Sequence, residues 1–77
     1  MKSDGWVIDA DGEWILRFKY DWDSWEQSPM VLIDKGRLMS NGIPLLKCRK
    51  RMRRKQAIVL WKNLLDSGWR RVKPKWE

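Results

Sequence analysis

The chain has 77 residues, 43% of them hydrophobic and 35% charged, a composition that indicates one small folded domain and excludes a disordered tail. No stretch approaches the roughly 20 apolar residues of a membrane-spanning helix, and the first residues lead into no apolar signal sequence. The net charge of +7 is unevenly spread: residues 1–45 carry 5 Lys and Arg against 8 Asp and Glu, whereas residues 46–77 carry 12 against 2. This asymmetry predicts an anionic partner for the second half of the chain.

Residues 6–20 have the pattern of a β-hairpin. Asp11-Gly12 lies between two alternating runs, and a two-residue turn of this kind needs a positive φ at both positions. With these two residues as the loop, Trp6 faces Arg17 across the ladder, and the strands cover about 6–9 and 13–20. One face of the second strand is apolar and predicts the core; its residues are Trp14, Leu16, Phe18 and Tyr20, joined by Val7 from the first strand.

The opposite face of the same hairpin also carries apolar residues. A sheet covered on one side has a mostly polar second face, so these residues would form an exposed patch unless the termini or a partner cover them. Such a patch predicts a protein-interaction surface, or self-association through the same residues. With two tryptophans of the following loop, the candidate set is Trp6, Ile8, Ile15, Trp22 and Trp25.

Residues 21–29 combine turn formers with a closing proline and show no periodicity, so we expect a loop. Its acidic residues Asp21, Asp23 and Glu26 come without the Gly and the later Glu of a calcium-binding loop, and we therefore expect no metal site.

The middle of the chain predicts short strands separated by turns. Residues 30–33 are apolar on both sides of the pleat, which indicates a central strand. Asp34-Lys35-Gly36 is predicted to be a turn, and a short strand at 37–39 would follow it. Asn41-Gly42 is a further turn signal.

A helix is predicted from about residue 53 to residue 66, because the apolar residues of this segment follow one helical face. Gly68 then occupies the position that favours a left-handed cap. Residues 43–50 do not continue the same face, so we expect them to be extended or irregular. The basic tail, 69–77, alternates loosely and could add an edge strand. These elements predict an α+β fold, an antiparallel sheet of three or four strands with one C-terminal helix packed on one face.

Several of these features occur in a characteristic order along the chain. In chain order they are Asp11-Gly12-Glu13-Trp14, Arg17-Phe18, Asp34 with Gly36, the Arg-rich residues 49–54, Ala57 with Trp61 and Leu64, and Gly68-Trp69-Arg70. Over about residues 6–71 this order resembles a family of small uncharacterised cyanobacterial proteins, classified as a domain of unknown function. The resemblance implies a cyanobacterial, cytoplasmic setting and no known activity, so no functional residues are carried over.

Seven of the nine residues from 47 to 55 are cationic. Crowding like charges costs electrostatic self-repulsion, which phosphate groups relieve, and Arg binds phosphate bidentately. Trp76, beside Lys75, is placed to stack on a base. The alternatives are a solvated charged stretch that aids solubility and aromatic residues that only cover a small core. The candidate nucleic-acid-binding residues are Lys47, Arg49, Lys50, Arg51, Arg53, Arg54, Lys55, Arg70, Arg71 and Trp76.

The residue types that catalysis needs are scarce. The chain has no His, no Gly-rich phosphate loop and no paired-Cys motif, so we predict no enzyme and no cofactor. The single Cys48 excludes an intrachain disulfide, which fits a reducing cytoplasm. Two hypotheses follow: a small nucleic-acid-binding accessory or regulatory protein that contacts phosphate backbones, or a protein-interaction module or small subunit of a larger complex that uses the apolar sheet face.

Overall fold

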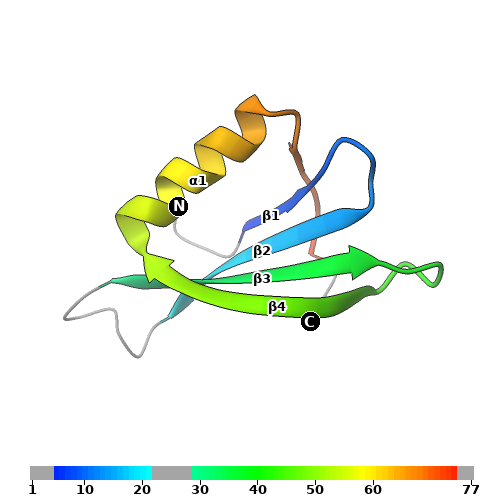
Figure 1. The fold of residues 1–77 in the computed structure, drawn as a ribbon, viewed down its shortest axis with the longest axis horizontal. Coiled ribbons are helices and arrows are strands. Elements are labelled where there is room, and N and C mark those ends of the chain that lie inside the picture. The colour runs from blue at the N-terminus through cyan, green and yellow to red at the C-terminus, as the bar shows by residue number, and fades with distance from the viewer. Residues whose placement is uncertain (1–4, 22–28, 75–77) are drawn as a thin grey trace.

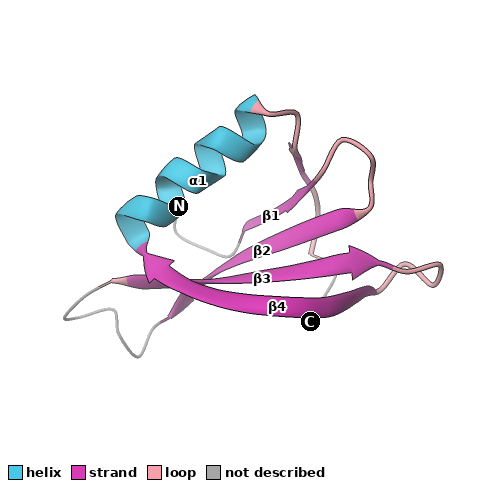
Figure 2. Cartoon of the chain, viewed as in Figure 1, coloured by secondary structure: helices cyan, strands magenta, loops and turns pink. Residues whose placement is uncertain are grey.

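The computed structural model describes residues 5–21 and 29–74. Four strands form an antiparallel meander, the helix α1 then crosses one face of the sheet, and a fifth strand pairs with the first (Figure 1). The sheet order is β4-β3-β2-β1-β5, and Figure 2 shows all of these strands on one side of α1. The elements are β1 (Gly5–Ile8), β2 (Trp14–Asp21), β3 (Met30–Leu38), β4 (Pro44–Arg53), α1 (Arg54–Asp66) and β5 (Arg70–Arg71).

The α+β class and the packing of one helix on an antiparallel sheet are confirmed. The expected three or four strands are too few, because the sheet has five within the described ranges. The edge strand that the basic tail could add is present, since β5 follows the helix and pairs Arg71 with Val7. The short β5 therefore carries the chain to the edge of the sheet opposite β4.

The first hairpin has the predicted register but a different turn. Only Gly12 has a positive φ, 73°, whereas the expected two-residue turn needs one at Asp11 as well. The amide of Gly12 donates a hydrogen bond to the carbonyl of Asp9 at 3.1 Å. The Asp9 carboxylate accepts bonds from the amides of Glu13 and Trp14, so this one side chain holds the loop of residues 10–13.

The β3–β4 hairpin has the same kind of turn, at the predicted Asn41-Gly42. Gly42 has a φ of 80°, and its amide donates to the carbonyl of Met39 at 2.9 Å. The Asn41 side chain accepts a bond from the amide of Ile43 at 2.9 Å. The turn of each hairpin thus contains a glycine that adopts a left-handed conformation.

The expected turn at Asp34-Lys35-Gly36 is wrong, because these residues lie inside β3. Asp34 is opposite Arg17 on β2 and Arg49 on β4, and a β-bulge lies between Lys35 and Gly36. Local turn propensity is overridden here because the buried carboxylate has cationic partners on both neighbouring strands. The predicted strand at 37–39 is the end of β3, and the basic stretch after it is the ten-residue strand β4.

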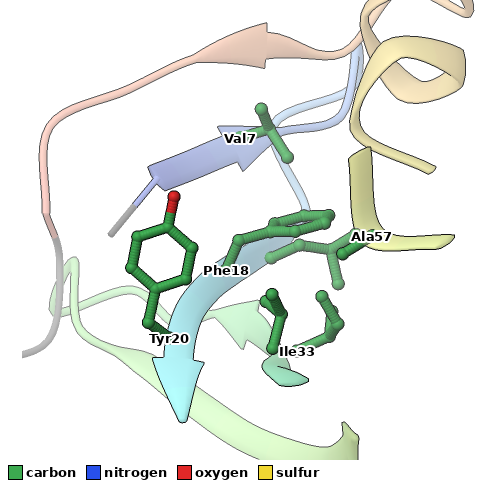
Figure 3. Close-up of a cluster of buried hydrophobic side chains, with 7 residues drawn as sticks. Val7, Phe18, Tyr20, Ile33 and Ala57 are labelled. Carbon is green, nitrogen blue, oxygen red and sulfur yellow. The ribbon is translucent and has the colours of Figure 1, made fainter. Parts of the chain in front are cut away.

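The core lies between α1 and the sheet (Figure 3). Phe18 is fully buried and meets Trp61 of the helix edge to face, with 5.1 Å between the ring centroids. The predicted core face of β2 is confirmed, although Trp14 is only half-buried. The buried cluster consists of Val7, Leu16, Phe18, Tyr20, Val31, Ile33 and Ala57.

The helix begins and ends as its sequence predicts. Its first residue is Arg54, and Gly68 beyond its end has a φ of 101°. The amide of Gly68 donates to the carbonyl of Leu65, and the amide of Trp69 donates to the carbonyl of Leu64. This pair of bonds is a Schellman cap, which turns the chain toward β5. No helix among the described residues is long and apolar enough to cross a lipid bilayer.

The expected exposed patch on the other sheet face is not present. Trp6, Ile8 and Ile15 are buried, with 4%, 6% and 0% of their surface exposed. The guanidinium of Arg17 lies 5.5 Å from the centroid of the Trp6 ring, and Arg70 of β5 is opposite Ile8. The Arg17 guanidinium thus covers part of the Trp6 ring, and β5 gives Ile8 a neighbour on the side away from β2. Trp22 and Trp25 lie outside the described residues.

Candidate nucleic-acid interface

The basic run is an edge strand that continues directly into the first turn of α1. Strand geometry sends alternate side chains to opposite faces of the sheet. Arg49, Arg51 and Arg53 therefore lie on the face away from α1, which we call the outer face, and Arg49 there contacts Asp34. Lys50 lies on the helix side, where it lines a cavity together with Leu60 of α1. The predicted cationic cluster is thus divided between the two faces, with the three arginines on the outer face and Lys50 on the helix side.

Asp34 organises the outer face. Its side chain is fully buried, and its carboxylate accepts hydrogen bonds from Nε of Arg17 at 3.1 Å and from Nη2 of Arg49 at 3.0 Å. Burial alone would raise the pKa of Asp34, but the bonds and positive charges of Arg49 and Arg17 outweigh it and hold this pKa below its usual value. The same carboxylate raises the pKa of Arg49.

A second carboxylate holds the next arginine of the row. Nε of Arg51 lies 3.0 Å from Oδ2 of Asp21, and the two side chains are 53% and 17% exposed. The side chain of Arg49 is similarly 50% exposed. Each guanidinium therefore binds a carboxylate of the sheet while about half of its side chain stays accessible to solvent, and its other N–H donors are chemically suited to bind an anion.

The internal carboxylates neutralise only part of this surface. On the outer face of β2, β3 and β4, the described residues include the five cations and two carboxylates named below, which leave a net charge of +3. The cations are Arg17, Lys19, Arg49, Arg51 and Arg53, and the carboxylates are Asp21 and Asp34.

The start of α1 extends the same positive surface. Arg54 and Lys55 are exposed, and the first turn contains no acidic residue. Arg53 stands at the N-cap without a capping side-chain hydrogen bond. Cations at the positive end of the helix dipole are unfavourable to the isolated helix, so this turn intensifies the local positive potential.

The structure does not bring all ten predicted residues together. Arg70 and Arg71 lie on β5, at the edge of the sheet opposite β4. The guanidinium of Arg71 lies 5.5 Å from the Trp61 ring centroid, on the helix side. Trp76 lies outside the described residues. The remaining predicted residues other than Lys50 are exposed along β4 and the start of α1; they are Lys47, Arg49, Arg51, Arg53, Arg54 and Lys55.

Sequence reasoning misses the carboxylates that orient this group. It places Asp34 in a turn and so does not identify it as a partner of the arginines. The acidic loop with Asp21 is a candidate to neutralise part of the basic patch, but sequence alone assigns it no particular arginine. The length of the segment could have revealed Asp34. If residues 30–38 form one strand, Asp34 lies on the same face as Leu32 and Gly36. A charge buried there requires a cation on a neighbouring strand.

Comparison with known proteins gives one match. The model of a family described as protein of unknown function, DUF1651, matches residues 4–76. Searches of the curated proteins and of the solved structures give no significant match. Because the family model spans nearly the whole chain, the protein belongs to DUF1651, a family of proteins of unknown function.

Proposed function

We propose that the protein is a small nucleic-acid-binding accessory or regulatory protein that contacts phosphate backbones through the outer face of β4 and the start of α1. The observation that supports it most is the row of arginines on β4, in which Arg49 and Arg51 are held by carboxylates while half of each side chain stays exposed. Alternate residues of a strand are about 6.8 Å apart, so this row presents cations along one track.

The proposed contacts give affinity without a choice of base sequence. Guanidinium groups bind phosphate oxygens bidentately, and backbone contacts carry no direct sequence information. Trp6 is the outer-face tryptophan among the described residues, and its exposure of 4% leaves no ring surface for a base to stack on. The proposal therefore predicts binding to DNA or RNA with little dependence on sequence.

A titration at two salt concentrations tests this proposal. The purified protein is titrated against labelled single-stranded DNA, duplex DNA and RNA at about 50 and 200 mM salt. Three phosphate contacts to duplex DNA predict a slope of about −3 in a plot of log K against log salt concentration. Absence of binding at the lower concentration, or an affinity indifferent to salt, contradicts the proposal.

A protein-interaction module is the second candidate function. Its surface cannot be the expected sheet face, because Trp6, Ile8 and Ile15 are buried there, so other exposed apolar residues have to provide it. Met39, Ile43, Leu45 and Leu46 have 47%, 58%, 49% and 48% of their surface exposed, around the β3–β4 turn and the first half of β4. Exposed apolar residues are typical of interaction sites, and the consecutive Leu45 and Leu46 present one apolar side chain to each face of β4. Changing Ile43 and Leu45 to Ser should abolish a pull-down partner and leave the unfolding curve unchanged. An unchanged set of partners speaks against this candidate, and sedimentation at several concentrations tests self-association.

We also propose a cytoplasmic setting in a cyanobacterium. The support is the resemblance carried by the Asp11-Gly12 hairpin, the Arg-rich stretch and the end of α1, together with the single, exposed Cys48. A tagged copy found outside the cytoplasm of a cyanobacterial host contradicts this setting.

A further inference from the structure

A second basic feature lies on the helix side of the sheet. A cavity of about 250 Å³ opens between α1 and strands β2 to β4. Its apolar lining comes from Leu16, Ile33, Met52 and Leu60, and Lys35, Lys50 and Cys48 complete it. The cavity combines an apolar floor with the side chains of two lysines.

The register of β3 and β4 places the two lysines close to each other. Ile33 is opposite Lys50 and Lys35 is opposite Cys48, so the lysines form a diagonal pair on adjacent strands. Side chains in such a pair start about 7–8 Å apart, a separation at which long side chains can reach a common group. One anionic group can therefore lie between both ammonium groups when the Lys35 side chain turns toward Lys50.

The charges of these lysines are not matched by carboxylates. Among the described residues, Lys35 and Lys50 form no ion pair, and no acidic side chain lines the cavity. The ammonium of Lys35 lies 4.6 Å from the centroid of the Trp14 ring, which does not line the cavity, so an anion bound at the cavity has to draw this ammonium from the ring toward Lys50. Lys50 differs in this respect from its neighbours Arg49 and Arg51, whose charges are matched by carboxylates of the sheet.

We propose that this cavity binds a small organic anion with an apolar body. The body packs against the apolar floor, and the anionic group lies between Lys35 and Lys50. Lysine side chains commonly cover apolar surface with their methylene stems. Here the stems leave an open volume, and its lining has the combination of apolar area and a few polar groups that small-molecule sites show. The site is independent of the proposed nucleic-acid interface, because it lies on the other face of the sheet.

Two fluorescent probes that differ in charge test the proposal. Anilinonaphthalene sulfonate carries the anionic group, and N-phenylnaphthylamine has a similar apolar body without it. Both are titrated into the full chain and into a variant with Lys35→Gln and Lys50→Gln. We expect the sulfonate to lose about threefold to tenfold in affinity, the effect of two partly exposed ion pairs, and the neutral probe to lose none.

Two control variants separate the cavity from general surface charge. Lys62→Gln removes an exposed cation from α1, and Lys73→Gln removes one from the segment after β5; neither should change the affinity for the sulfonate. Leu60→Trp fills the cavity and should weaken both probes, and the unfolding curve of each variant verifies that it folds. Failure of the sulfonate to bind, or an equal loss in Lys62→Gln, overturns the proposal.

The thiol of Cys48 supplies a separate readout. Cys48 is exposed and lines the cavity, so a bound sulfonate probe should slow its alkylation by iodoacetamide. The double lysine variant should lose most of this protection at the same probe concentration. An alkylation rate that the probe leaves unchanged places the probe elsewhere on the protein and contradicts the proposal.

Discussion

Asp34 of β3 and Arg49 of the edge strand β4 form an ion pair in which the carboxylate is fully buried and the guanidinium is half exposed. Arg17 of β2 binds the same carboxylate from the other side. A charge in the interior of the sheet is therefore neutralised from both neighbouring strands, and the surplus positive charge stays on the surface. The same arginine thus has a structural role on one edge and is available to an anion on the other.

Replacing Asp34 by Asn tests the structural role. The variant leaves Arg17 and Arg49 facing each other without the charge between them, and we expect the free energy of unfolding to fall by about 2–3 kcal/mol. This value lies below the roughly 3–5 kcal/mol of a fully buried pair because Arg49 is half exposed. Asp21→Asn is the control, and its partly exposed pair predicts a smaller loss, of about 1 kcal/mol or less. Urea unfolding measures both, and equal losses would show that burial of Asp34 is unimportant.

The lowered pKa of Asp34 predicts a loss of stability in acid. The unfolded state keeps an ordinary Asp pKa of about 3.9, so it binds more protons than the folded state as the pH falls below that value. The stabilisation is thus fully present above the unfolded pKa and is lost as the pH falls through the folded one. The chain has no His, so no imidazole contributes. Urea unfolding at pH 7 and pH 3, at one ionic strength, should show a smaller acid loss in Asp34→Asn than in the wild type. The same loss in both proteins would assign the acid effect to other carboxylates.

The features that sequence predicts well are those set by neighbours along the chain. The helix from Arg54 to Asp66 follows from apolar spacing and from Gly68, and the register of the first hairpin follows from Asp11-Gly12. Asp34 could not be assigned in this way, because its partners Arg17 and Arg49 are 17 and 15 residues away. Local propensity predicts a turn at Asp34 and Gly36, whereas in the sheet both residues belong to β3 and Asp34 is a buried charge.

The candidate site is predictable in composition but not in geometry. The cationic residues 47–55 are recognised from charge alone. Which face each of them occupies depends on β4 being a strand, and this segment has no apolar alternation that would show it. The apolar surface is misplaced for a related reason: the burial of Trp6 and Ile15 depends on neighbours that only the assembled sheet supplies.

Replacing Gly68 tests whether the end of α1 is set by local backbone conformation. Its φ of 101° is costly for any residue with a Cβ, so Gly68→Ala should lower the free energy of unfolding by roughly 1–2 kcal/mol. A Cβ at this position would lie 3.9 Å from that of Ala10, an ordinary contact, so the loss is conformational and not steric. Gly68→Asn should lose less, because Asn tolerates the left-handed region better. Thermal unfolding of the two variants measures the difference, and equal losses would indicate a packing effect instead.

The position of the cations, and not only their number, decides nucleic-acid binding in our proposal. A variant with Arg51→Gln, Arg53→Gln and Lys55→Gln loses three charges from β4 and the start of α1. Arg49 is kept because it neutralises Asp34. The matched control changes Arg37, Lys62 and Lys73, which are exposed elsewhere, and reaches the same net charge. The first variant should reduce the salt slope for duplex DNA by about 0.9 for each phosphate that the protein no longer neutralises, and the control should keep most of the slope. Fluorescence anisotropy at several salt concentrations compares them. If both variants lose affinity equally, the protein binds through its net charge and β4 is not an interface.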